Sequence, residues 1–252
     1  MGSKGMCQPI PIMNRYNKVD TMMKDILSQQ IDYYRARAGE YNQWWYRQGR
    51  YDRGESANAL WSAEISQLQQ ALRALPSQGH ILELACGTGI WTRELIQMGD
   101  KITAVDASSE MIAINQVEVA SDKVDYIETD IFTWQSPIQY DMVFFSFWLS
   151  HVPPDRLNLF LSHVAGMLKP NGHIFIIDSR RVDESTAKDH VLPDEGVTLK
   201  RKLNDGREFE IVKVFYEPIS LRTDLAKVGL EADVKVTDKF FIYAHGQKKQ
   251  CQ

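Results

Sequence analysis

Residues 81–89 read ILELACGTG, a short apolar run that ends in two glycines separated by a threonine. An apolar run of this length is typical of a strand that is buried in a parallel sheet. Glycine adopts turns that other residues avoid, and it lacks the Cβ that keeps a ligand away from the backbone. The stretch therefore predicts a strand that leads, through a ligand-binding loop, into a helix.

Strands and helices alternate after this loop, and such alternation builds right-handed βαβ units around a parallel sheet. A pair of strands near the C-terminus is expected to be antiparallel. The predicted fold class is α/β, with a doubly wound, mostly parallel sheet of seven strands. The expected strands are 81–85, 101–105, 124–128, 140–146, 174–177, 234–236 and 240–244.

The first 54 residues are expected to form a helical cap on the sheet domain, which takes residues 55–252. Apolar residues recur between 20 and 45 at three- and four-residue steps, as in an amphipathic helix. Aromatic residues are dense in the cap, and two interpretations remain open: they pack the cap onto the main domain, or they line a substrate pocket. The polar segment 179–206 has no clear period and is expected to be an excursion from the sheet.

The composition limits the partners of this chain of 252 residues, which carries 29 basic and 33 acidic side chains and a net charge of −4. This balance gives no field that would attract nucleic acid or an anionic membrane. No apolar run approaches the roughly 18 residues that cross a bilayer. The three cysteines are too far apart for a zinc or redox motif. We expect a soluble cytoplasmic protein without a metal, and we predict no oligomeric state.

Asp106 ends the second expected strand, about 20 residues after the glycine loop, where an acidic side chain accepts hydrogen bonds from ribose hydroxyls. The alternative role of this residue is a helix N-cap. The third glycine of the dinucleotide fingerprint is replaced by Thr92, which weakens a pyrophosphate site. Glu83, at the strand end, suits a cationic aminoacyl group better than a pyrophosphate.

In order and spacing, five motifs resemble those of the class I S-adenosylmethionine (SAM)-dependent methyltransferases. Phe147 and Trp148 stand where methyltransferases that act on DNA bases carry an Asn/Asp-Pro-Pro-Tyr/Phe motif, which argues against base methylation. The motifs are 83–89 (ELACGTG), 104–111 (AVDASSEM), 126–132 (YIETDIF), 140–146 (YDMVFFS) and 168–173 (LKPNGH).

The resemblance implies a Rossmann-like fold and SAM as the cofactor. It also implies that Asp130 binds the adenine amino group and that Ile131 lies beside the adenine ring. The candidate cofactor-binding residues are Glu83, Gly87, Thr88, Gly89, Asp106, Ala107, Met111, Asp130, Ile131 and Phe147.

His151 is the candidate catalytic residue, because it follows the fourth strand at the edge of the sheet where ligands gather. Its ordinary pKa of about 6.5 suits a general base. The alternative is a histidine that caps the next helix or packs on Trp148. Paired guanidinium groups at Arg180 and Arg181 suit a carboxylate or phosphate, although such pairs are often simply solvated. The candidate substrate-binding residues are Tyr33, Tyr34, Trp44, Trp148, Arg180 and Arg181.

The sequence therefore predicts an enzyme that methylates a small, partly apolar molecule, in specialised metabolism. Three alternatives stay open at this point. The chain could methylate a carboxylate on a peptide or protein, it could be an NAD-dependent oxidoreductase, or it could bind SAM without catalysis. The missing third glycine and the position of Glu83 argue against the oxidoreductase.

Overall fold

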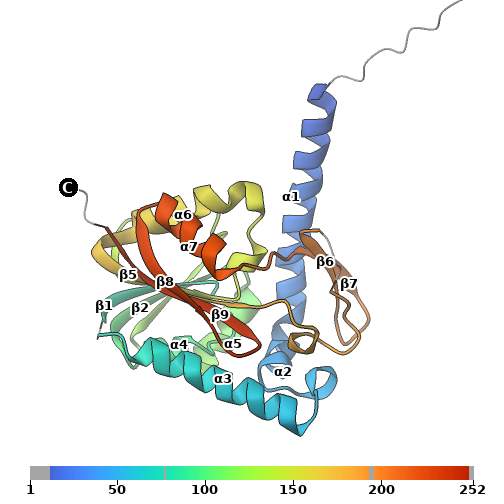
Figure 1. The fold of residues 1–252 in the computed structure, drawn as a ribbon, viewed down its shortest axis with the longest axis horizontal. Helices are drawn as coiled ribbons and strands as arrows, with labels where there is room; N and C mark the ends of the chain where they lie inside the picture. Colours follow the sequence, from blue (N-terminus) through green and yellow to red (C-terminus); the bar gives the residue numbers. More distant parts are fainter. Residues whose placement is uncertain (1–11, 77, 193–195, 250–252) are drawn as a thin grey trace, which may run out of the picture.

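The computed structural model describes residues 12–76, 78–192 and 196–249, and a seven-stranded sheet lies at its centre (Figure 1). The strand order is β3-β2-β1-β4-β5-β9-β8. The first five strands are parallel, and β9 is antiparallel to both of its neighbours. The predicted fold class is thus confirmed. The strands are β1 Gln78–Leu84, β2 Gly99–Asp106, β3 Val124–Glu128, β4 Tyr140–Ser146, β5 Leu168–Ser179, β8 Leu230–Val236 and β9 Phe241–Lys248.

Helices cover both faces of the sheet, as the continuous apolar runs of its central strands require. Successive residues of β4 point to opposite faces, so Phe144 packs on the side of Trp61 and Phe145 on the side of Leu161. The first side holds α3 Glu55–Arg73, α4 Thr92–Leu95 and α5 Ser109–Val119, and the second holds α6 Leu157–Met167 and α7 Pro218–Lys227.

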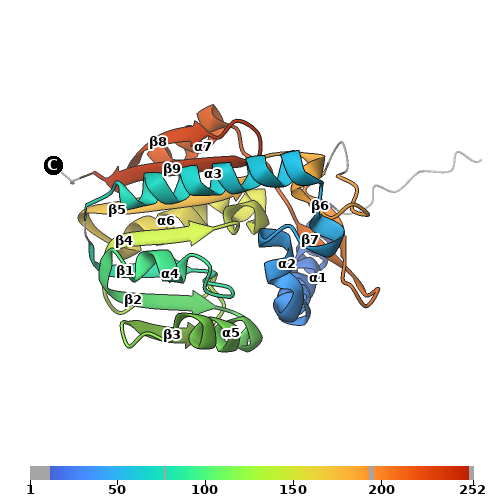
Figure 2. The ribbon, with the colours of Figure 1, turned by 90° about the horizontal axis from the view of Figure 1, so that it is seen from below.

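The helical cap lies at the carboxyl ends of the parallel strands (Figure 2). It contains α1 Ile12–Arg37 and α2 Tyr41–Trp45, which are separated by a 3-10 turn at Ala38–Glu40. One helix was expected from about residue 20 to 45, so both of its boundaries were wrong: α1 begins at Ile12 and ends at Arg37. Further 3-10 turns are Gly49–Tyr51, Leu149–His151, Pro154–Arg156 and Asp183–Ser185.

A separate hairpin of two antiparallel strands packs against α1 beside the sheet (Figure 1). Its strands are β6 Thr198–Lys202 and β7 Glu208–Val212. The first strand was missed, because β6 reads TLKRK and buries only Leu199. The alternating sequence at 208–216 also predicts a strand, and the strand present there ends at Val212. No helix in the described ranges is both long enough and apolar enough to cross a membrane.

Candidate active site

The glycine loop between β1 and α4 needs its two glycines for different reasons. Both have left-handed backbone angles, with φ of 53° at Gly87 and 90° at Gly89. A Cβ at Gly89 would lie 2.7 Å from Oδ1 of Asn115 on α5, so this glycine permits close packing. A Cβ at Gly87 would meet nothing within 4 Å. Gly87 therefore presents its backbone to an open cavity.

Asp106 holds the loop from the end of β2. Its Oδ2 accepts a hydrogen bond of 2.9 Å from the backbone N–H of Gly87, and its Oδ1 accepts one of 2.9 Å from that of Ser108. Burial raises the pKa of this carboxyl, while the backbone N–H groups oppose the rise. Each carboxylate oxygen can accept a second hydrogen bond. Asp106 is therefore equipped to bind a ligand hydroxyl while it fixes the loop.

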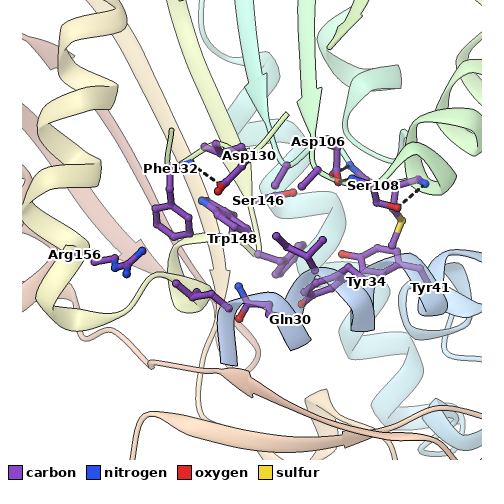
Figure 3. A pocket seen from close by; sticks show the side chains of 18 residues that line it. Gln30, Tyr34, Tyr41, Asp106, Ser108, Asp130, Phe132, Ser146, Trp148 and Arg156 are labelled. Atoms are coloured by element: carbon purple, nitrogen blue, oxygen red, sulfur yellow. Dashed lines mark hydrogen bonds between the residues drawn. The ribbon is translucent and has the colours of Figure 1, made fainter. Parts of the chain in front are cut away.

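A first cavity, called here the cofactor cavity, lies between the carboxyl ends of the parallel strands and α1 (Figure 3). Side chains of α1, including Gln30 and Tyr34, lie opposite Asp106 and Asp130. Of the ten residues expected to bind the cofactor, seven line this cavity. They are Gly87, Asp106, Ala107, Met111, Asp130, Ile131 and Phe147.

The other three expected cofactor residues do not line this cavity. Glu83 is 2% exposed and accepts a hydrogen bond of 2.7 Å from the hydroxyl of Thr92 beneath the loop. Burial raises the pKa of Glu83 to about 8, so this carboxyl is largely protonated at neutral pH. Thr88 donates to Oδ1 of Asn42 in the cap at 2.6 Å. Gly89, as described above, packs on α5.

Asp130 keeps one carboxylate oxygen available. Its Oδ1 accepts a 2.9 Å hydrogen bond from the backbone N–H of Phe132 (Figure 3). Its Oδ2 has no hydrogen-bond partner within the described part of the chain. This oxygen is free to accept from an amino group of a ligand, and the amino group of adenine has the required chemistry.

A second cavity, called here the cationic cavity, adjoins the first and shares Tyr34, Tyr41 and Phe147 with it. The cap, the ends of β4 and β5, and the β6–β7 hairpin all contribute to its wall. The residues that give it its charge and its polar groups are Arg37, Tyr51, His151, His190, Arg201 and Lys213.

Arg37 is a buried cation of this cavity, with 8% of its surface exposed. Its guanidinium lies 4.8 Å from the ring centre of Tyr41 and 5.5 Å from that of Tyr33. It donates to the hydroxyl of Tyr51 at 3.4 Å, and its Nε has no partner in the described ranges. No carboxylate among those residues forms an ion pair with it.

The other two cations differ in how far they are compensated. Arg201 donates to Nδ1 of His190 at 2.9 Å and has no ion pair within the part of the chain that is described. Lys213 lies 3.3 Å from Oδ1 of Asp178 and donates to the hydroxyls of Ser150 at 2.7 Å and Ser179 at 2.8 Å. Arg37 and Arg201 therefore supply the uncompensated positive charge.

His151 lies in the cationic cavity and is almost fully buried. Its Nδ1 is 2.6 Å from the carbonyl oxygen of Val212, and its Nε2 is 2.7 Å from the hydroxyl of Tyr34. Burial lowers its pKa well below the ordinary value, and the charge of Lys213 adds to the effect. The imidazole is therefore neutral at physiological pH.

The expected substrate residues fall into three groups. Tyr33, Tyr34 and Trp44 line the cationic cavity, whereas Trp148 lines the cofactor cavity instead. Arg180 and Arg181 line neither. Arg180 donates to the carbonyl oxygens of Thr237 and Asp238 at 3.2 Å each, and Arg181 lies over the ring of Phe215.

The aromatic residues of the cap have two kinds of surroundings. Trp45 packs on Trp91, and its carbonyl accepts from the indole of Trp61, so it joins the cap to the core. Trp44 and Tyr34 border the cationic cavity.

Comparison with known proteins agrees with this geometry. A family model described as "Methyltransferase domain" matches residues 81–172. The structure of DhpI in complex with SAH is 33% identical in sequence, with a TM-score of 0.72, and the match covers 90% of this chain and 98% of DhpI. The chain belongs to the class I SAM-dependent methyltransferases, and its cofactor is SAM.

Curated relatives match shorter stretches. The mitochondrial ubiquinone biosynthesis O-methyltransferase of Schizosaccharomyces pombe is 32% identical over 101 residues, which are 38% of this chain and 36% of that protein. The ubiquinone biosynthesis O-methyltransferase of Xanthomonas campestris is 26% identical over 150 residues, which are 58% of this chain and 60% of that protein. The chain thus matches only part of the length of either relative.

The residues of the cofactor cavity fit SAM. The backbone at Gly87 has no Cβ that would exclude a ligand, Asp106 offers oxygens suited to ribose hydroxyls, and Asp130 offers one suited to an amino group. When bound, SAM would supply an electrophilic methyl group on its sulfonium. Orienting it toward an acceptor and excluding water are the tasks left to the protein.

Proposed function

We propose that this protein transfers the methyl group of SAM to a small acceptor that carries an anionic group and binds in the cationic cavity. One observation carries the proposal. Arg37 and Arg201 line a cavity that adjoins the cofactor cavity, and neither has a carboxylate partner in the described ranges. The expectation of a partly apolar acceptor is revised accordingly.

Electrostatics favour an anion in this cavity. A buried charge is costly unless it is paired, and arginine forms strong hydrogen bonds in pairs with carboxylate or phosphate groups. Asp178 is paired with Lys213 and does not compensate the two arginines. The positive field also contributes to the low pKa of His151, since Lys213, Arg201 and Arg37 all disfavour its protonated form. An anionic acceptor supplies the missing negative charge.

The shared wall defines where the two ligands meet. Tyr34, Tyr41 and Phe147 border both cavities, so an acceptor among the arginines reaches the cofactor at these residues. Trp44 packs edge-on against Phe147 at 4.8 Å and fixes that ring from the cap side. Correct alignment of the two reactants supplies much of the rate of such a displacement. The chain's role is thus to align the acceptor and keep the junction dry.

Tyr34 and His151 are placed to receive a proton when the acceptor atom carries one. The hydroxyl of Tyr34 faces the junction and is hydrogen-bonded to the neutral imidazole of His151. A proton released by the acceptor would pass to the Tyr34 oxygen as the Tyr34 proton moves to Nε2. An acceptor that is already deprotonated needs no such step, and His151 then positions Tyr34.

Three further observations concern the nature of the acceptor. DhpI, the similar protein described above, was also solved in a complex with SAM and HEP, so that relative holds a second ligand beside SAM. The curated relatives are named as O-methyltransferases, which supports oxygen as the methylated atom. The cap, with α1 across the cofactor cavity and α2 against Phe147, favours a small molecule over a peptide or protein.

The test is a turnover screen with radiolabelled SAM and small metabolites in matched pairs, in which each anionic acceptor is accompanied by its neutral amide. We expect turnover of anionic members only. Arg37→Gln and Arg201→Gln should each raise KM for the acceptor about 10- to 150-fold, the loss expected for one charged hydrogen bond, with unchanged SAH affinity. Arg180→Gln, outside the cavity, is the control. Equal turnover of the neutral amides would contradict the proposal.

A further inference from the structure

The serine and threonine side chains that line the cationic cavity are Ser179, Ser185 and Thr186. The hydroxyl of Ser185 donates to the carbonyl oxygen of Val182 at 2.7 Å. The hydroxyl of Thr186 donates to the carbonyl oxygen of Ala187 at 3.1 Å. Both of these groups therefore use their hydrogens on nearby backbone. Ser179 differs from them, because its oxygen receives a hydrogen bond from a lysine.

Ser179 is the last residue of β5, where Lys213 lies against the end of the strand. Side chains alternate between the faces of a strand, so Ser179 lies on the side of Ile177 and Asp178 on the other side. Lys213 is close to both, with its Nζ 2.8 Å from Oγ of Ser179 and 3.3 Å from Oδ1 of Asp178. The ammonium group therefore lies between the serine hydroxyl and the carboxylate.

The contact with Lys213 limits where the Ser179 hydroxyl can point. An ammonium group has three donors and no acceptor, so Lys213 donates and the Ser179 oxygen accepts. Within the described part of the chain, the hydroxyl hydrogen reaches only Oδ1 of Asp178, at 3.4 Å. That distance exceeds the roughly 2.5–3.0 Å of an ordinary O–H···O bond. The same oxygen already accepts from the backbone N–H of Ser179 at 2.8 Å, so the hydroxyl hydrogen remains available to a ligand.

Ser150 has the same contact with Lys213 but a different position. Its oxygen also accepts from the ammonium group, at 2.7 Å. Ser150 is 0% exposed and lines neither cavity, whereas Ser179 is 8% exposed and lines the cationic cavity. Of the two hydroxyls that Lys213 holds, that of Ser179 is therefore the one placed to meet a ligand.

We propose that Ser179 is an acceptor-binding residue, whose hydroxyl donates a hydrogen bond to the anionic group of the acceptor. The inference rests on the proposed function, because it requires an anion in the cationic cavity. A hydroxyl beside an ammonium group is suited to this role, since its oxygen accepts from the lysine and its hydrogen is left for an acceptor atom. Arg37, Arg201 and Ser179 then hold the anionic group from α1, β6 and β5.

The test measures the binding of inorganic sulfate to the SAH-saturated protein by calorimetry, at constant ionic strength and neutral pH. Sulfate has no proton to donate, so a serine can bind it only as a donor. The wild type should bind sulfate, and Ser179→Ala should bind it about 10- to 150-fold more weakly, through loss of one hydrogen bond to a charged group. Ser179→Thr keeps the hydroxyl and should bind sulfate more tightly than Ser179→Ala. Ser150→Ala is the matched control and should bind it as the wild type does.

SAH affinity should stay unchanged in these variants, because neither serine lines the cofactor cavity, and circular dichroism checks the fold. If Arg201→Gln weakens sulfate binding and Ser179→Ala does not, the inference is overturned while the proposed function stands. Equal losses in Ser179→Ala and Ser150→Ala would also overturn it, because both hydroxyls would then only hold the lysine. If the wild type does not bind sulfate, or if Arg201→Gln binds it equally well, the anionic site is wrong and the inference is overturned with it.

Discussion

The hydroxyl of Tyr34 donates to Nε2 of His151 across 2.7 Å, which joins α1 to the 3-10 turn after β4. The direction follows from the other ring nitrogen. Nδ1 is 2.6 Å from the carbonyl oxygen of Val212, which can only accept, so Nδ1 carries the proton and Nε2 accepts. Tyr34 lines both cavities, whereas His151 lines only the cationic cavity.

This pair leads to the first prediction, on catalysis. With an acceptor that must lose a proton, His151→Ala and Tyr34→Phe should each lower kcat by about 10²–10⁴, the usual contribution of a general base. SAH affinity in His151→Ala should stay nearly unchanged, because His151 lies outside the cofactor cavity. The double variant should be no slower than the worse single variant, because residues that act as a unit are not additive. If the single-turnover rate of the double variant falls by the product of the two single losses, the two residues act separately.

A second prediction concerns pH and stability. The folded pKa of His151 is lowered well below 6.5 by burial and Lys213, and that of His190 is lowered to about 3 by burial and Arg201. Between these values and 6.5 the unfolded chain binds more protons than the native one. The free energy of unfolding should therefore fall as the pH falls below 6.5. Urea unfolding at pH 7.5 and 5.5 measures this, and His151→Ala should show a smaller fall than the wild type. If the free energy of unfolding falls equally in both proteins, His151 is not a source of this pH dependence.

The pH dependence of stability that Glu83 contributes has the opposite sign. Burial raises its folded pKa from 4.5 to about 8, so its contribution to stability is complete below pH 4.5 and is lost as the pH rises through 8. Glu83→Gln keeps an acceptor for Thr92 but does not titrate. Between pH 6 and 9 the wild type should lose more thermal stability than this variant, and both should bind SAH alike. If Glu83→Gln folds but no longer binds SAH, the result would support the expectation that Glu83 contacts the cofactor.

Asp106→Asn should weaken cofactor binding strongly without unfolding the chain. If the carboxylate accepts two ribose hydroxyls, its loss should weaken SAH binding by about 10²- to 10⁴-fold. Asp100→Asn, an exposed position at the start of the same strand, is the matched control. Calorimetry measures affinity, and circular dichroism checks the fold. Wild-type affinity in Asp106→Asn would mean that this residue only holds the loop through Gly87 and Ser108.

The contact between Thr88 and Asn42 fastens the cap to the glycine loop. Asn42→Ala should speed SAH dissociation about 2- to 12-fold through loss of one neutral hydrogen bond, with little change in association. Asn204→Ala, which removes a different amide contact with α2 at Gln43, serves as the control. Stopped-flow measurements separate the two rates, and an unchanged dissociation rate would assign the contact to packing alone.

The sheet could be predicted from the sequence because its strands are encoded locally. Each central strand is a short apolar run followed by turn residues, and burial on both faces requires that composition. The helix that the sequence predicts after the glycine loop is only Thr92–Leu95, because turns at Gln97 and Met98 lead directly into β2. β6 was missed because three of its five side chains are charged and only Leu199 is buried, and its hairpin is stabilised by α1, which is distant in sequence.

The same distinction applies to the site. The glycine loop, Asp106 and Asp130 each lie at or just after the end of a strand in a short motif, so their meeting at one edge of the sheet could be predicted. The cationic cavity combines Arg37 from α1, Arg201 from β6 and Lys213 after β7. No local pattern connects these positions, so Arg201 and Lys213 were not identified. The adjacent pair Arg180 and Arg181 was proposed instead, and neither lines the cavity.

Helix α1 contributes Gln30 to the cofactor cavity, Arg37 to the cationic cavity, and Tyr34 to both. Any ligand that fixes the position of α1 from one cavity also fixes the side chains that α1 contributes to the other cavity. The two binding equilibria are therefore thermodynamically coupled. If SAH raises the affinity for the acceptor by some factor, the acceptor must raise the affinity for SAH by the same factor.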